Sequence, residues 1–204
     1  MRVGIAGAGG HAKVVGDALL STGEAELVGF LDDDPRLLGT AILGYPVLGP
    51  IAEWGHFDLD GVVVAVGDNR RRQALFDGLV AAGATALTVQ HSRSTVAAST
   101  RLGAGTVAFA NAVVNVDTLI GEDVILNTAC SVDHDCEIAS HVHLAPGVRL
   151  AGGVRVGEGA FLGIGAVAVP GVVVGAWATV GAGAVVLRDV RLGATVVGVP
   201  AREV

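Results

Sequence analysis

The chain has 204 residues, a formal net charge of -7 at pH 7, and 51% hydrophobic but only 16% charged residues. The negative charge argues against a nucleic-acid partner, which would call for a basic face. No apolar run approaches the ~18 residues of a membrane-spanning helix, so we expect no membrane partner. No signal peptide precedes the first predicted strand, and we expect a cytoplasmic protein.

The first part of the chain alternates predicted strands and helices. Strands are predicted at 2–6, 26–31, 61–66 and 84–89, a helical turn at 51–54, and a helix at about 70–82. Another helix follows the first strand, with Val14, Val15, Ala18 and Leu19 on one face. This alternation predicts a Rossmann-like parallel α/β domain over residues 1–91.

Three of the predicted strands end in chemistry that suits a nucleotide. Ligands bind at the carboxyl ends of parallel strands. At the first strand end, the bare backbone of Gly7–His11 before a helix favours a phosphate. At the second, the cluster Asp32–Asp34 can accept hydrogen bonds from hydroxyls or a base edge. The third strand end is the segment Gly67–Asn69. A glycine-rich turn without a ligand is the plain alternative.

The same loop also fits a second class of enzyme. Gly7, Gly9 and Ala12, with Asp32 about twenty residues on, satisfy the dinucleotide fingerprint, so an NAD-dependent oxidoreductase is an alternative. A full dinucleotide fold uses two such halves, whereas this domain ends near residue 91. One half is enough for a mononucleotide or a nucleotide-sugar diphosphate.

A period of six residues begins near Val96 and runs to about Val186. Helices repeat every 3.6 residues and strands every 2, whereas a period of six is the signature of a β-solenoid built from short strands and tight corners. We therefore predict a parallel β-helix of hexapeptide repeats over residues 92–204. The repeating aliphatic or Ala positions are Val96, Leu102, Ala108, Val114, Ile120, Leu126, Val132, Ile138, Leu144, Leu150, Val156, Leu162, Ala168, Val174, Val180 and Val186.

A polar stretch, Asp133–Cys136, interrupts the solenoid pattern. The phase of the repeat places His134 at a corner, pointing outward, with Gly152 directly above it one coil later. A neutral imidazole acts as a general base at physiological pH, and Asp135 would raise its basicity. Adjacent strand residues face opposite ways, so contact between these two side chains requires corner geometry. A corner histidine without a role is the alternative.

Other candidate groups follow in the solenoid. His141 and His143 are two apart and would share a strand face, but no third ligand is evident, so we predict no metal. Cys130 and Cys136 occupy equivalent small inward positions, which predicts buried thiols rather than a disulfide. The closing segment 197–202 suits an anionic, adenine-bearing ligand, and a simple capping tail is compatible with it.

The whole chain resembles the bacterial nucleotide-sugar acetyltransferases of the PglD/NeuD type, within the hexapeptide-repeat, left-handed β-helix acyltransferases. The resemblance implies that acetyl-CoA, as co-substrate, donates an acetyl group to the amine of a UDP- or GDP-linked amino sugar. It makes His134 the general base and Asp135 its partner. The matching segments are Gly7–His11, Leu31–Asp33, Ala65–Asn69, Asn127–Thr128, His134–Cys136 and Gly198–Ala201.

The resemblance also implies where the ligands bind. The assembly would be a homotrimer with acetyl-CoA in the groove between subunits, and Gly152 would donate its amide to the thioester oxygen. The acetyl-CoA positions are His143, Gly152, Ile164 and Ala182, and the nucleotide-sugar positions are Gly9, Gly10, His11, Asp32, Asp33 and Gly67. A sugar O-acetyltransferase and a non-catalytic trimer that binds a nucleotide sugar remain further alternatives.

Overall fold

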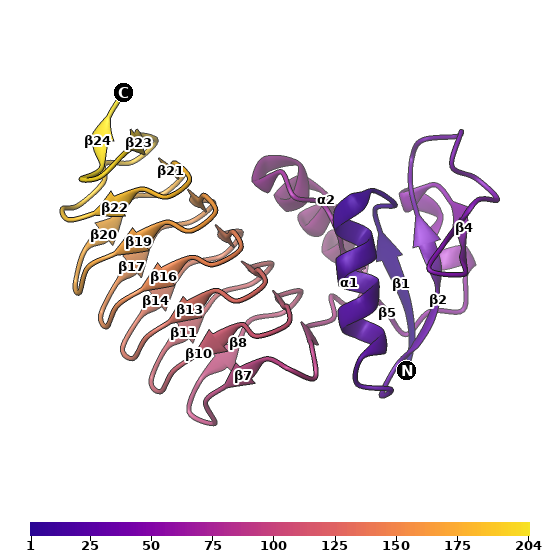
Figure 1. Cartoon of the computed structure of the whole chain (residues 1–204). Coiled ribbons are helices and arrows are strands. Elements are labelled where there is room, and N and C mark those ends of the chain that lie inside the picture. The colour runs from indigo at the N-terminus through magenta and orange to yellow at the C-terminus, as the bar shows by residue number, and fades with distance from the viewer. The chain divides into compact units, whose positions relative to one another are not determined.

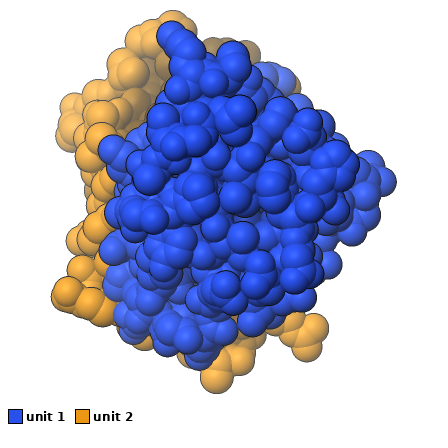
Figure 2. Space-filling view, turned by 90° about the vertical axis from the view of Figure 1, so that its right-hand side faces the viewer, with its two compact units in different colours: residues 1–92 blue, residues 93–204 orange.

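The computed structural model describes residues 1–204, and its trace is shown in Figure 1. The chain forms two compact units, residues 1–92 and 93–204, which Figure 2 colours blue and orange. Each unit has a hydrophobic cluster of its own. No helix in either unit has the length and apolar character needed to span a membrane.

The first unit is a five-stranded, mostly parallel sheet with two helices. Its strands are β1 (Arg2–Ala6), β2 (Glu26–Leu31), β3 (Ala41–Ile42), β4 (Tyr45–Gly49) and β5 (Gly61–Val64), in the order β3-β4-β2-β1-β5. Helix α1 (Gly10–Leu20) follows β1, the 3-10 helix η1 (Ile51–His56) follows β4, and α2 (Asn69–Ala81) follows β5. Because β1 runs parallel to both β2 and β5, the carboxyl ends of these three strands lie at one edge.

One strand prediction in this unit is wrong, and two strands were not predicted. The segment between Asp34 and Ile51, for which no strand was predicted, contains β3 and β4, and β4 pairs in parallel with β2. Residues 84–89 do not form the expected strand. Only an isolated bridge between Val62 and Ala86 and the short β6 (Val89–Gln90) are found there. Pairing with a neighbour, rather than local composition, decides both cases.

The helices agree more closely with the sequence, with one change of face. Val14 is 40% exposed, whereas Ala12 and Val15 are fully buried. Helix α2 starts one residue earlier than predicted, since Asp68 caps it by accepting a hydrogen bond from the Arg71 N–H at 2.8 Å. Such caps satisfy backbone donors that the first helical turn leaves unpaired.

The second unit is a left-handed parallel β-helix of two-residue strands. Its strands are β7 (Thr95–Val96), β8 (Arg101–Leu102), β9 (Val107–Ala108), β10 (Val113–Val114), β11 (Leu119–Ile120), β12 (Ile125–Leu126), β13 (Ser131–Val132), β14 (Glu137–Ile138), β15 (His143–Leu144), β16 (Arg149–Leu150), β17 (Arg155–Val156), β18 (Phe161–Leu162), β19 (Val167–Ala168), β20 (Val173–Val174), β21 (Thr179–Val180) and β22 (Val185–Val186). An end hairpin of β23 (Thr195–Val197) and β24 (Arg202–Glu203) follows.

These strands stack into three flat faces. The first face holds β7, β10, β13, β16, β19 and β22, the second β8, β11, β14, β17 and β20, and the third β9, β12, β15, β18, β21 and β23. We call the bend between the first and second faces the first corner, that between the second and third the second corner, and that between the third and first the third corner. Ladder partners such as Val114 and Val132 belong to successive coils.

The six-residue period follows from this geometry. Each coil buries an aliphatic residue and a small one per face, as Val132 and Cys130 show at 0% exposure. Both cysteines are free and buried, which confirms the prediction of thiols. The corners require left-handed backbone, and Asp135 adopts it with a φ of 58°. Asp tolerates such angles better than most residues that carry a side chain.

Candidate functional site

His134 lies at the first corner, between β13 and β14. Its Nδ1 is 2.7 Å from Oδ2 of Asp135, and the two side chains are 57% and 67% exposed. The left-handed backbone of Asp135 is what turns these consecutive side chains toward each other. The corner therefore provides the contact that regular strand alternation would forbid.

This pair gives His134 the properties of a base. With the Asp135 carboxylate accepting the Nδ1 proton, the lone pair of a neutral ring lies on Nε2. The hydrogen bond that His134 donates to Asp135 raises the pKa of His134 above its usual value, and the charge of Asp133 is the next largest cause. A raised pKa means that Nε2 binds a proton more strongly, as proton abstraction from a substrate requires.

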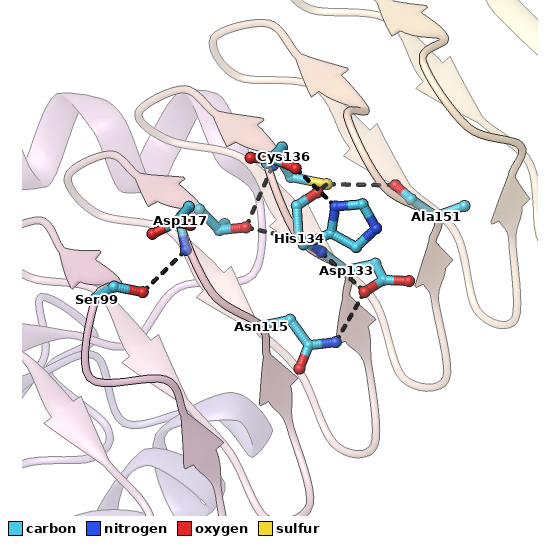
Figure 3. Close-up of polar contacts among 9 residues, drawn as sticks. Ser99, Asn115, Asp117, Asp133, His134, Cys136 and Ala151 are labelled. Atoms are coloured by element: carbon cyan, nitrogen blue, oxygen red, sulfur yellow. Dashed lines mark hydrogen bonds and ion pairs between the residues drawn. The ribbon is translucent and has the colours of Figure 1, made fainter.

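A network of corner hydrogen bonds fixes the backbone at this point (Figure 3). The Asp133 carboxylate accepts hydrogen bonds from the His134 N–H and from Nδ2 of Asn115, both at 2.9 Å. The Cys136 thiol donates to the Ala151 carbonyl at 3.3 Å, which connects this coil to the next. Asn115 and Asp133 were not predicted as site residues. Their spacing of one full coil is the signal that could have revealed the contact.

Gly152 packs directly against the imidazole. A Cβ built on Gly152 would lie 2.6 Å from Cε1 and 2.7 Å from Nε2 of His134, so only glycine fits beneath the ring. Gly152 lies over His134 as the repeat predicted, and the imidazole fills the space that the missing side chain leaves. The Gly152 N–H makes no hydrogen bond within the chain. It remains available as a donor next to the base.

Ile164 and Ala182 lie one coil apart at the third corner, away from His134. Ile164 is 62% exposed, and Ala182 is exposed as well. The Ala182 nitrogen passes so close to Gly163 that a Cβ there would lie 2.7 Å from it. The four residues predicted around acetyl-CoA are thus not gathered at one place in a single chain.

His143 lies on the third face, in β15. It is only 8% exposed, its Nε2 is 3.2 Å from Nδ2 of Asn127, and its ring meets Phe161 edge-on at a centroid distance of 5.2 Å. Because an amide Nδ2 is a donor, this contact assigns Nε2 of His143 as the acceptor. Asn127 was noted in the sequence only as part of a motif, and its role in holding His143 was missed.

His141 precedes β15 and pairs with Asp123 at the second corner. Its Nδ1 is 2.8 Å from Oδ2 of Asp123, and the two side chains are only 9% and 1% exposed. The two histidines therefore have different partners, although they are two residues apart. No group of three or more His, Cys, Asp or Glu side chains is placed to hold a metal ion.

The three glycines predicted for the first unit share an open environment. Gly9, Gly10 and Gly67 have no atom within 4 Å of a Cβ built on them, and none has the positive φ that would favour glycine. The fold itself therefore does not require glycine at these positions. Gly7 is different, because its φ is +117° and a Cβ would lie 2.8 Å from the Ala65 carbonyl oxygen.

Two carboxylates of the cluster Asp32–Asp34 are hydrogen-bonded to backbone N–H groups at the sheet edge. Asp32 accepts hydrogen bonds from the N–H groups of Ala8 and Asp34 at 2.8 and 2.9 Å, and Asp33 accepts one from Ile51 at 2.9 Å. These carboxylates hold the loops around the carboxyl ends of β1 and β2. Asp34 binds Arg36 instead, and this contact lowers the pKa of Asp34 to about 2.

Each unit contains a cavity that is relevant to ligand binding. The first, of about 290 Å³, lies between η1 and α2 and is lined by Asp33, Trp54, Leu75 and Leu79 among others. The second, of about 380 Å³, lies at the end of the solenoid. Its lining includes three arginines, Arg188, Arg191 and Arg202, with Asp189 and Glu203.

Comparison with known proteins gives matches over the whole chain. Residues 2–79 match the PglD N-terminal domain family and residues 153–188 the bacterial transferase hexapeptide family of six repeats. No curated protein matches the chain.

Several solved structures are similar over their full length. The acetyltransferase domain of PglB from Neisseria gonorrhoeae FA1090, in complex with acetyl coenzyme A, is 37% identical with a TM-score of 0.95, covering 100% of this chain and 98% of that one. A mutant of GDP-perosamine N-acetyl transferase from Caulobacter crescentus, in complex with CoA and GDP-perosamine, is 42% identical with a TM-score of 0.94, covering 100% and 97%. WeeI from Acinetobacter baumannii AYE is 30% identical with a TM-score of 0.89, covering 100% of both chains.

Proposed function

Because the chain belongs to the family of PglD-type, hexapeptide-repeat sugar N-acetyltransferases, we propose that it transfers an acetyl group from acetyl-CoA to the amine of a nucleotide-linked sugar, with His134 as general base. One observation carries the assignment of the base. His134 and Asp135 are paired and exposed at a corner, the pKa of His134 is raised, and its imidazole packs on a glycine whose N–H is available. Family membership gives no support to the oxidoreductase alternative.

The chemistry follows from these groups. The neutral sugar amine attacks the thioester carbonyl carbon, and Nε2 of His134 accepts a proton from the amine as the C–N bond forms. The Gly152 N–H donates to the oxygen on which negative charge develops. The C–S bond then breaks, and the proton held by His134 passes to the leaving thiolate of CoA. Asp135 stabilises the imidazolium formed between these steps. Positioned proton transfer of this kind contributes about 10²- to 10⁴-fold.

The donor site is proposed to lie between two copies of the chain in a homotrimer. Gly152 is at the first corner, whereas Ile164 and Ala182 are at the third, so a single chain presents only part of the predicted set. A neighbouring copy that packs its third corner against this first corner completes it, and cyclic symmetry repeats that contact around the ring. The arginine-lined cavity at the end of the solenoid suits the anionic end of CoA.

The acceptor is proposed to bind at the sheet edge of the first unit. Glycines that the fold does not require at positions 9, 10 and 67 leave bare backbone at the start of α1 and after β5, where a diphosphate can approach N–H groups. Asp32 and Asp33 border this edge, and His11 begins the helix beside it. The cavity next to Asp33 and Trp54 offers an aromatic wall and a carboxylate acceptor to a base.

A direct assay tests the reaction. Purified protein is incubated with acetyl-CoA and a panel of UDP- and GDP-linked 4-amino sugars, and the products are identified by mass and by sensitivity to mild base. We expect an amide on one of these sugars. A base-labile ester as the product would mean that the acceptor group is a hydroxyl and not an amine. Thermal stabilisation by a nucleotide sugar without any turnover would favour the non-catalytic trimer, and stabilisation by NADH alone would favour an oxidoreductase.

Subunit complementation tests the shared donor site. His134→Ala and Ile164→Arg are each expected to inactivate the enzyme, the first at the base and the second at the acetyl-CoA position. Coexpressed in equal amounts, the two variants assemble at random, so that about a quarter of all trimer interfaces pair an intact His134 with an intact Ile164 of another subunit. Recovery of activity near that fraction supports the proposal. Mixed trimers that stay inactive would place the whole site within one chain.

A further inference from the structure

Arg72 is a charged side chain at the centre of the first unit. It lies on α2, is 1% exposed, and is the largest of the side chains with less than 2% exposure. Its neighbours on the same helix, Arg70 and Arg71, are exposed. A guanidinium loses strong hydration when it is buried, and an apolar residue of similar volume often stabilises such a position better. The buried charge therefore suggests a role other than packing.

Two contacts of Arg72 lie on the segment that follows β5. Its Nη1 donates to Oδ1 of Asn69 at 2.9 Å, and the Val66 carbonyl oxygen is 3.5 Å from the same nitrogen. These two residues bracket Gly67, one of the open glycines of the proposed acceptor site. The guanidinium thus holds the Gly67 segment from its protein side, while the other side remains open.

Arg72 also contributes to the electrostatics at the start of α1. Burial, followed by the charge of Arg72, lowers the pKa of His11 to about 4, so His11 is neutral at physiological pH. Arginine keeps its charge at any such pH. Helices α1 and α2 both begin at the carboxyl ends of adjacent strands, β1 and β5, and their N-termini add positive potential. The carboxylates of Asp32 and Asp68 accept backbone N–H groups at the same edge.

We propose that Arg72 is a positioning residue for the nucleotide-sugar site: it fixes the Gly67 segment from behind and supplies a permanent positive charge beneath the diphosphate without touching it. This inference rests on the function proposed above. It assigns the cationic character of the acceptor site to a residue inside the unit, while His11 serves there as a neutral hydrogen-bonding group.

Steady-state kinetics of Arg72→Met, Arg72→Lys and the exposed control Arg71→Met test this role. Loss of a charge-assisted contact leads us to expect that Arg72→Met raises KM for the nucleotide sugar about 10- to 100-fold. The KM for acetyl-CoA and kcat at saturation should change by less than about twofold, since the chemistry is assigned to the other unit. Arg72→Lys should recover part of the loss, and Arg71→Met should match the unmodified protein. An unchanged nucleotide-sugar KM in Arg72→Met would overturn the proposal.

A second readout does not depend on turnover. The pKa of His11 is measured by NMR titration of imidazole-labelled protein. It should rise in Arg72→Met, remain low in Arg72→Lys, and be unaffected in Arg71→Met. Since burial alone also lowers the pKa of His11, only a pKa that is unchanged in Arg72→Met would contradict the electrostatic part. If Arg72→Met does not fold, Arg72→Lys tests the proposal by itself. The expected result is then a raised KM for the nucleotide sugar together with an unchanged His11 pKa. Unmodified protein that acetylates no nucleotide sugar would reject the proposed function, whereas the titration would still report on Arg72.

Discussion

The solenoid contains two histidine–aspartate pairs of nearly identical length in opposite surroundings. His134 and Asp135 are consecutive, 2.7 Å apart and more than half exposed at the first corner. His141 and Asp123 come from successive coils, are 2.8 Å apart and are almost fully buried at the second corner. The same two chemical groups therefore form an exposed pair at the first corner and a buried pair at the second corner.

The two pairs differ in environment rather than in geometry, and this difference separates the histidine proposed as the base from the buried one. At the first corner a glycine leaves room against the ring, a second carboxylate adds charge, and solvent reaches both partners. At the second corner each partner shields the other from water, so the pair contributes to how successive coils stack. Four predictions test this division, from the largest expected effect to the smallest.

Removal of the exposed imidazole should have the greatest consequence for activity. His134→Ala is expected to lower kcat about 10²- to 10⁴-fold, the range contributed by a positioned base. Since the side chain is exposed, the melting temperature and acetyl-CoA binding should stay within error. Isothermal titration calorimetry measures acetyl-CoA binding, a thermal melt measures the melting temperature, and a discontinuous assay measures kcat. Substantial turnover by this variant would remove the base assignment.

Removal of the buried imidazole should affect stability instead. His141→Ala leaves the Asp123 carboxylate inside the solenoid without this partner, and loss of one member of a buried pair costs about 3–5 kcal/mol. We expect a lower midpoint in urea denaturation, while kcat of the remaining folded enzyme changes little. A matching loss of activity at unchanged stability would show that the second corner belongs to the active site.

Replacement of the exposed carboxylate should shift the pH profile. Asp135 raises the pKa of His134, and the base works only when neutral, so activity falls as pH drops through that pKa. Asp135→Asn keeps the shape and the left-handed backbone but removes the charge, which lowers the pKa. The acid limb of kcat/KM should move to lower pH, and the plateau should fall by less than the ~10²-fold that marks the low end of acid–base contributions, since the imidazole itself remains. An acid limb at unchanged pH would show that Asp135 does not set the pKa of His134.

The smallest effect is expected from the surrounding network. Asn115→Ala removes one hydrogen bond to Asp133, which is worth about 1 kcal/mol. The corner retains its other backbone contacts, so kcat should fall less than about threefold. A decrease as large as that of Asp135→Asn would mean that Asn115 positions the base directly.

Much of the solenoid could be predicted because its repeat encodes its own contacts. A period of six fixes which side chains point inward, and the ladders that result place Gly152 over His134 without further information. The first unit was harder, since β4 depends on pairing with β2 and not on local pattern. The exposed Val14 shows the same limit, because a helix face is chosen by what packs on it.

The site residues divide in a similar way. The motif identified His134 and Asp135, but their contact depends on one left-handed residue that the sequence could only permit. The pairs Asn127–His143 and Asp123–His141 join different coils, so residues that look unrelated along the chain become neighbours. Arg72 was missed for another reason. It stands in a run of three arginines, and nothing in that run indicates which one is buried.

The constant offset of 18 between partners such as Asn115 and Asp133 limits how this protein can change length. An insertion of one whole coil beyond the last site residue would extend the column by about 4.8 Å and leave every corner aligned. An insertion of one hexad between His143 and Ile164 would instead rotate all later positions by a third of a turn. Ile164 would then leave its corner, and the proposed trimer would bring a different corner to each His134. In evolution, indels near the middle of this domain should therefore come in multiples of a full coil.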